Sequence, residues 1–182
     1  MSFKEFLRSP LGVGSAFPAS RCLIRRMLAP IDWNNACWVV EYGPGAGGFT
    51  RALLDLLPDQ ARLVAIDTGK WFIRGLEENL PDERLYPVAG SAAQVRSILS
   101  CLGIEQVDCI VSGLPFSTLP PSAARKIMDD SRAVLAPGGH FLAYQMRDAI
   151  APLLRERFAK VETGFEWRNV PPCRLYWATG VL

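Results

Sequence analysis

The segment of this sequence with the clearest chemical meaning is a glycine-rich stretch that follows an apolar run. It reads EYGPGAGGF over residues 41–49, with four glycines among six consecutive residues. Glycines let a backbone turn tightly and let a ligand approach it closely. Asp67 ends the next apolar run, and a carboxylate there can accept hydrogen bonds from both hydroxyls of a ribose. Together these features predict a site for a nucleoside-containing ligand.

Two ligand classes fit the glycines, and the acid before them helps to choose. Gly43, Gly45 and Gly48 satisfy the dinucleotide pattern G-x-G-x-x-G, which cradles a pyrophosphate. Glu41, Gly43, Gly45 and Gly47 satisfy E-x-G-x-G-x-G, which resembles motif I of the class I S-adenosylmethionine-dependent methyltransferases. A carboxylate beside the loop repels a pyrophosphate but suits a ligand with an ammonium and a sulfonium. S-adenosylmethionine is therefore the expected cofactor.

The resemblance to class I methyltransferases also implies individual cofactor contacts. Asp67 would hold the ribose and Ser91 the adenine, with Thr68 and Ala92 as neighbouring cofactor contacts. Members of this class often carry acids where this chain has Gly69 and Ser91. Because Ser91 is a weaker hydrogen-bonding group than an acid, a backbone N–H is the alternative contact to the adenine. These two departures also keep open a cofactor-binding module without catalysis. The implied cofactor-binding residues are Glu41, Gly43, Gly45, Gly47, Asp67, Thr68, Ser91, Ala92 and Ser112.

A second informative segment, SGLPF over residues 112–116, follows the fourth apolar run. Enzymes that methylate adenine or amide nitrogens place Asn or Asp here, followed by Pro and an aromatic residue. Ser112 stands in the polar position of this chain, Leu114 fixes the course of the loop with the proline, and Phe116 supplies the ring. We expect this loop to hold the acceptor amine; the alternative is a strand end followed by a simple proline turn.

Three segments carry a more specific resemblance. SGLPFSTLP at 112–120, WRNVPPC at 167–173 and FLRSPLGVGSAFPASR at 6–21 resemble the bacterial phospholipid N-methyltransferases, which convert phosphatidylethanolamine to phosphatidylcholine. The related ribosomal RNA adenine dimethyltransferases share motif I, but they have Asn in place of Ser112 and a further RNA-binding domain. The resemblance implies methylation of the phosphatidylethanolamine head group. RNA adenine or another small-substrate N-methylation remains the alternative, and a nucleic-acid partner is not expected.

Three further residues have expected roles toward such a substrate. Tyr144 would orient the amine, Arg147 would meet a lipid phosphate, and the product cation would rest on the ring of Tyr144, Phe116 or Trp71. The alternative is ordinary packing for Tyr144 and a solvated charge for Arg147. The expected catalytic group is therefore Ser112, Leu114, Phe116 and Tyr144.

Apolar runs and helical patterns alternate along the chain, which predicts a parallel sheet with helices on both faces. Only five residues separate the last two runs, too few for a parallel crossover, so these strands form an antiparallel hairpin. The predicted fold is α/β: a Rossmann-like class I methyltransferase fold with seven strands, mostly parallel. Strands are expected at 36–42, 62–67, 84–89, 107–112, 140–145, 160–168 and 174–181, and helices at 49–57, 71–80, 94–102, 121–135 and 150–158.

The charge of the chain is unevenly distributed. The 182 residues carry a net charge of +2, but residues 1–30 carry +4 and residues 31–182 carry −2. We therefore predict a basic helical arm and lid over 1–30 and a methyltransferase domain over 31–182. Residues 2–8 place Phe3, Phe6 and Leu7 on one helical face, as in helices that lie on an anionic membrane. The expected partners are that membrane surface and a phospholipid substrate, and the expected location is cytoplasmic, peripheral on the inner face of the cytoplasmic membrane.

The cysteines and the single histidine do not form a metal-binding pattern. Five cysteines lack any C-x-x-C spacing, and His140 stands alone. We therefore expect no metal, and mostly buried, reduced thiols in a reducing compartment.

Overall fold

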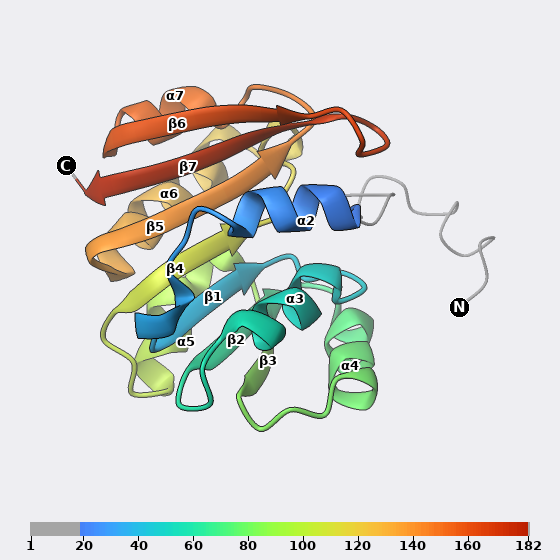
Figure 1. Ribbon diagram of the computed structural model, residues 1–182. Helices are drawn as coiled ribbons and strands as arrows, with labels where there is room; N and C mark the ends of the chain where they lie inside the picture. The colour runs from blue at the N-terminus through green and yellow to red at the C-terminus, as the bar shows by residue number, and fades with distance from the viewer. Residues whose placement is uncertain (1–18, 182) are drawn as a thin grey trace.

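The computed structural model of the chain describes residues 19–181, which form a seven-stranded sheet with helices on both faces (Figure 1). The strand order is β3-β2-β1-β4-β5-β7-β6; the first five strands are parallel, and β7 is antiparallel to both of its neighbours. This order confirms the predicted architecture. The strands are β1 (Trp38–Tyr42), β2 (Arg62–Asp67), β3 (Leu85–Ala89), β4 (Val107–Ser112), β5 (Leu135–Gln145), β6 (Phe158–Glu166) and β7 (Cys173–Val181).

The helices divide between the two faces according to the alternation of the strand residues. Val39 and Glu41 of β1 face one layer, whereas Val40 and Tyr42 face the other. In Figure 1, α2 and α3 lie in front of the sheet, and α5 and α6 lie behind it. The layer on the Val39 side consists of α2 (Arg21–Leu28), α3 (Gly48–Leu56) and α4 (Lys70–Asn79). The layer on the other side consists of α5 (Val95–Cys101), α6 (Pro121–Val134) and α7 (Ala151–Arg155). Three short 3-10 helices are η1 (Trp33–Asn35), η2 (Ala92–Gln94) and η3 (Phe116–Thr118).

Most element boundaries differ from the sequence prediction by one to three residues, and the starts of β5 and β6 differ for a clear structural reason. Strand β5 begins at Leu135, not at His140, because the Pro137–Gly139 segment stays within the strand as an irregularity where the pairing with β4 shifts register. Strand β6 begins at Phe158, which the helical pattern had included in the preceding helix. Phe158 packs against Phe141 with ring centroids 6.0 Å apart, so burial in the sheet core outweighs the helical pattern.

The cysteines only partly meet the expectation of burial. Cys109 and Cys173 are buried, but Cys37 and Cys101 are exposed because they lie at element ends, directly before β1 and at the last residue of α5. All five thiols are free. Within residues 19–181, no group of three His, Cys, Asp or Glu side chains is arranged to hold a metal ion.

Helix α2 comes from the predicted basic arm and packs on the sheet. Leu23, Met27 and Leu28 are buried in the same apolar layer as α3, and the Trp177 indole N–H donates to the Met27 carbonyl at 2.8 Å. The predicted amphipathic segment 2–8 lies outside the described residues. No helix in the described part of the chain is long and apolar enough to cross a membrane.

The packing of α2 yields a stability prediction. Met27 has no exposed surface, so Met27→Ala should lower the free energy of unfolding by about 2–5 kcal/mol through lost burial and a cavity. Urea denaturation measures this. Arg25→Ala on the exposed face of α2 is the matched control and should change stability by less than about 0.5 kcal/mol. Equal effects of the two variants would show that α2 is not part of the folded core.

Candidate functional site

Three loops begin side by side at the carboxyl edge of the parallel strands. The Gly43 amide donates to the Ile66 carbonyl of β2 at 3.0 Å, and the Gly113 amide donates to the Tyr42 carbonyl of β1 at 2.9 Å. The Gly90 amide donates to the Asp67 carbonyl in the same way at 2.9 Å. The strand order reverses between β1 and β4, and such a switch point is where ligands bind in open α/β sheets.

The glycine loop after β1 uses left-handed backbone conformations. Gly43, Gly45 and Gly47 have φ of 71°, 53° and 81°, and a residue with a side chain adopts such values only with strain. A Cβ at Gly47 would lie 2.8 Å from a methyl of Leu76, so this glycine also allows α4 to pack closely. A Cβ at Gly45 would meet nothing within 4 Å. The backbone at Gly45 is therefore open to a ligand, while the flanking glycines pack against protein.

Glu41 is a buried carboxylate beside this loop. Its side chain is almost inaccessible, and it accepts a hydrogen bond of 2.7 Å from the Thr50 hydroxyl of α3. Burial raises the pKa of Glu41 to about 7, opposed by the Thr50 hydrogen bond and assisted by the negative charge of Asp67. A positively charged ligand would restore the ionised form, so this group suits the cationic methionyl part of S-adenosylmethionine.

Asp67 lies at the end of β2 and faces the glycine loop. One of its oxygens accepts the Gly69 amide at 2.8 Å, and burial raises the pKa of its carboxyl, opposed by the nearby backbone amides of Gly69 and Gly45. A carboxylate offers about four lone-pair positions, so acceptors remain for ribose hydroxyls. A Cβ at Gly69 would lie 2.8 Å from the Phe72 ring, which explains why no second acid stands there. Thr68, between them, is exposed.

The residues expected at the adenine form a cap. The Ser91 hydroxyl accepts the Ala93 amide at 3.2 Å, and the Gln94 side chain accepts the Ser91 amide at 3.2 Å, forming a capping box at η2. Ala92 is the first residue of this turn, so its amide has no acceptor within the turn. A backbone N–H is thus available there for a ring nitrogen, while the Ser91 side chain already caps the turn.

The loop after β4 is held by a residue that the sequence analysis did not single out as functional. Gln145 donates to the Leu114 carbonyl at 2.7 Å and accepts the Phe116 amide at 3.2 Å. The sequence feature that could have indicated this role is that Gln145 is a polar residue at the end of an otherwise apolar strand. Ser112 is fully buried and its hydroxyl accepts the Leu114 amide at 3.4 Å, while Phe116 is buried in the core on the α5–α7 side.

Tyr144 occupies the gap between the loops after β1 and β4. A Cβ at Gly113 would lie 2.5 Å from the Tyr144 hydroxyl oxygen and 3.3 Å from the Gly43 carbonyl oxygen. The Tyr144 hydroxyl therefore sits where a side chain at position 113 would be. Its ring stacks on Phe49 of α3, with centroids 5.0 Å apart and 15° between the planes. Burial, with the nearby Glu41, raises its pKa, so the hydroxyl stays protonated at neutral pH.

A small pocket opens beside this hydroxyl, and neither Trp71 nor Arg147 is among the residues that line it. Trp71 is 47% exposed in the first turn of α4, and Arg147 is exposed after β5. A larger depression of about 640 Å³, which includes Gln106 and Gly138, lies at the opposite edge of the sheet, away from the glycine loop. The small pocket is lined by Gly113, Leu114, Pro115, Ser117, Tyr144, Gln145, Met146 and Cys173.

This combination of fold and site defines a class I methyltransferase. The open backbone at Gly45, the Asp67 carboxylate at the end of β2 and the buried Glu41 fit S-adenosylmethionine, and the small pocket beside Tyr144 lies across the switch point. Residues 39–139 match the methyltransferase domain family, and the chain belongs to the S-adenosylmethionine-dependent methyltransferases. S-adenosylmethionine is its methyl donor.

Similar proteins agree with this assignment. The chain is 32% identical to the ornithine lipid N-methyltransferase of Singulisphaera acidiphila, over 97% of this chain and 93% of that protein. It is 29% identical to ribosomal RNA small subunit methyltransferase A of Acidithiobacillus ferrooxidans, over 59% of this chain but only 39% of that protein. The N-methyltransferase NodS of Bradyrhizobium japonicum, solved with S-adenosyl-L-homocysteine, has the same fold, with a TM-score of 0.67, 21% identity and coverage of 86% and 83%.

The burial of Glu41 predicts a stability difference that depends on pH. The folded-state pKa of about 7 lies above the ordinary value of 4.5, so stability from this group is full below about pH 4.5 and is lost as the pH rises through 7. Glu41→Gln has no charge to bury. The variant should therefore gain stability relative to wild type between about pH 5 and 8, by roughly 2–4 kcal/mol.

Urea unfolding of the cofactor-free proteins across that range measures the difference. Glu78→Gln, on the exposed side of α4, is the control and should show no such trend. A constant difference between wild type and Glu41→Gln at every pH would contradict the raised pKa.

Proposed function

We propose that this chain methylates the primary amine of a membrane aminolipid. The observation that carries the proposal is the extent of the similarity. The chain aligns with almost the whole of the ornithine lipid N-methyltransferase, but with only 23–39% of the ribosomal RNA methyltransferases to which it is similar. The segments outside the shared cofactor-binding core therefore favour a lipid acceptor over RNA.

Two head groups fit this chemistry. Phosphatidylethanolamine, implied by the sequence resemblance, and ornithine lipids both present an aliphatic amine that is protonated in water. Such an amine must lose a proton before it can attack a methyl group. A half-buried site of low dielectric favours the neutral amine over the ammonium, which lowers the cost of this step.

The chain's own residues would then orient the amine. S-adenosylmethionine, when bound, supplies a methyl group activated by its positively charged sulfur. The Tyr144 hydroxyl, which lies between the loops after β1 and β4, offers an oxygen lone pair to an amine N–H and so directs the nitrogen lone pair toward the cofactor side of the gap. A methyl group of Leu114 lies 3.3 Å from the position that a Cβ at Gly43 would take, so the two loops pack closely and exclude water between them.

The other predicted site residues have supporting roles in this proposal. Ser112, Phe116 and Gln145 are buried and fix the course of the acceptor loop, so they act by positioning. Trp71 is exposed on α4 and Arg147 is exposed after β5; we propose that the indole ring contacts the methylated cation and that the guanidinium contacts a head-group phosphate. The basic residues among the first thirty positions, where α2 packs on the sheet, are proposed to face an anionic membrane surface.

The substrate class is tested by supplying labelled S-adenosylmethionine with separate acceptors. The acceptors are vesicles containing phosphatidylethanolamine, vesicles containing an ornithine lipid, and ribosomal RNA. Label in either lipid supports the proposal and identifies the head group. Label in RNA alone, or in none of these acceptors, would overturn the proposal.

Tyr144 yields a kinetic prediction. Tyr144→Phe keeps the ring stacked on Phe49 but removes the hydroxyl, so kcat on the aminolipid should fall about tenfold or more while cofactor affinity and thermal stability stay near wild type.

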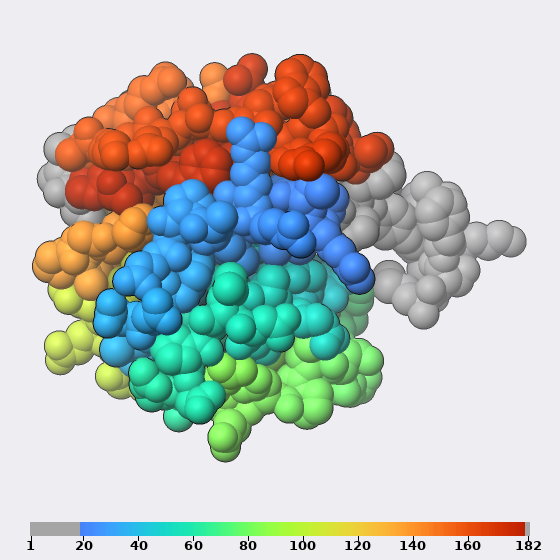
Figure 2. Space-filling view, viewed as in Figure 1, coloured from blue at the N-terminus to red at the C-terminus, as the bar shows by residue number. Residues whose placement is uncertain are grey.

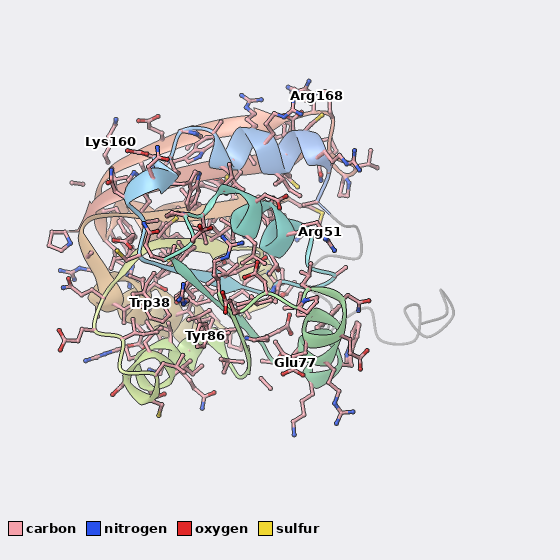
Figure 3. The ribbon with its side chains drawn as sticks, turned by 60° about the horizontal axis from the view of Figure 1, so that its bottom comes forward. Trp38, Arg51, Glu77, Tyr86, Lys160 and Arg168 are labelled. Atoms are coloured by element: carbon pink, nitrogen blue, oxygen red, sulfur yellow. The ribbon has the colours of Figure 1, made fainter. Side chains whose placement is uncertain are left out.

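The matched control is Tyr86→Phe at the amino edge of the sheet, where the ring lies beside Trp38 (Figure 3). This control should retain full activity. Loss of cofactor binding in Tyr144→Phe, with kcat unchanged at saturating cofactor, would show that the hydroxyl serves the cofactor instead.

A further inference from the structure

The exposed apolar side chains of this protein gather at one edge of the sheet. Among the described residues, six large apolar side chains are exposed. Two of them, Leu56 and Leu102, lie at ends of helices on the amino side of the parallel strands. The other four lie at the carboxyl edge, as does the small pocket beside Tyr144, which is the acceptor pocket of the proposed function. They are Trp71 (47%), Met146 (53%), Trp167 (75%) and Val170 (73%).

The two most exposed of these residues form the tip of the β6–β7 hairpin. Gln145, at the end of β5, pairs with Arg174 of β7, and Glu166 of β6 pairs with Cys173. The connecting segment 167–172 therefore projects past the carboxyl end of β5 (Figure 1), and Cys173 lines the same pocket as Tyr144. The tip stands next to the place where an acceptor amine would enter.

The hairpin tip is held by a framework of hydrogen bonds and rings. Asn169 is buried; its side-chain oxygen accepts the Ser20 amide at 2.8 Å, and its side-chain nitrogen donates to the Pro171 carbonyl at 2.7 Å. The Trp167 ring lies on Phe165, with centroids 4.2 Å apart. The hydrogen bond to Ser20 joins the hairpin tip, with its exposed Trp167 and Val170, to the start of α2. The hairpin and α2 form one continuous surface (Figure 2).

The surroundings of the tip are strongly basic. The neighbouring segments 20–28, 146–149 and 166–174 contain six arginines and only two acids. Of these acids, Glu166 is buried and shared between Arg168 at 3.0 Å and Arg26 at 3.7 Å, and Asp148 accepts the Tyr176 hydroxyl. Arg168 lies at the end of the hairpin (Figure 3). The apolar tip is therefore bordered by positive charge.

We propose that the β6–β7 hairpin tip inserts Trp167 and Val170 into the interface of an anionic lipid bilayer, with the surrounding arginines on the phosphates. Indole and aliphatic side chains favour the interfacial region, and each nearby arginine adds attraction to anionic lipid. Docking at this edge would hold the acceptor pocket against the membrane surface, where an amine head group could enter without leaving the bilayer. The inference deepens the proposed function, on which it rests, by assigning the docking surface.

The test is sedimentation of the full-length protein with sucrose-loaded vesicles of phosphatidylcholine, with or without phosphatidylglycerol. Wild type should bind the vesicles with phosphatidylglycerol more tightly, and binding should weaken as salt rises. Trp167→Ser combined with Val170→Ser should weaken binding about tenfold or more. Leu56→Ser combined with Leu102→Ser, which removes the same kind of surface from the other edge, should bind like wild type. Thermal unfolding checks that both variants are folded.

A second measurement separates this inference from the substrate assignment. Dihexanoyl phosphatidylethanolamine, dissolved as monomers, needs no membrane docking, so the hairpin variant should methylate it at the wild-type rate if the wild type does so. Vesicle binding that depends on Trp167 and Val170 supports the docking surface even if no aminolipid is methylated. Wild-type protein that ignores the anionic vesicles, or a folded hairpin variant that binds them as well as wild type, would overturn it.

Discussion

The close approach of two backbone segments at the switch point determines how this site is built. Gly43 begins the loop after β1 and Gly113 begins the loop after β4, and each is hydrogen-bonded to the neighbouring strand at its first amide. Because neither residue has a side chain, the loops come near enough for the Tyr144 hydroxyl to fill the gap. In the proposed function the cofactor and the acceptor amine meet at this contact, because direct methyl transfer requires the two bound molecules to be adjacent.

The electrostatics of the site follow from burial on one side of this contact. Glu41 and Asp67 both have raised pKa values because the fold takes their carboxyls partly or wholly from water. Negative charge is thus costly in the empty site and is compensated when a cationic ligand arrives. The same burial raises the pKa of Tyr144, and in the proposed function its hydroxyl orients the amine by hydrogen bonding instead of removing a proton.

Local patterns were enough to predict the sheet and the position of the glycine loop. The alternation of strands and helices predicted the seven strands, and the short link 169–173 predicted the antiparallel hairpin. The glycines after the first strand and Asp67 at the end of the second strand lie at the same edge of the sheet, as expected. The features that could not be predicted depend on distant contacts. Gln145 holds a loop some thirty residues earlier in the chain, and the reason for Gly113 is the Tyr144 hydroxyl from another strand. The Pro137–Gly139 segment has the composition of a loop, and only the pairing of β5 with β4 shows that it belongs to a strand.

The assignment of the β1–β2 edge as the cofactor site is tested most directly by calorimetric titration of S-adenosylmethionine into wild type and Asp67→Ala. Loss of the ribose acceptor should weaken binding by about 1–3 kcal/mol, the usual cost of removing a charged hydrogen-bond partner. Asp59→Ala, which removes an exposed carboxylate from the loop before β2, should bind like wild type. Unchanged affinity in a folded Asp67→Ala protein would contradict the assignment of this edge.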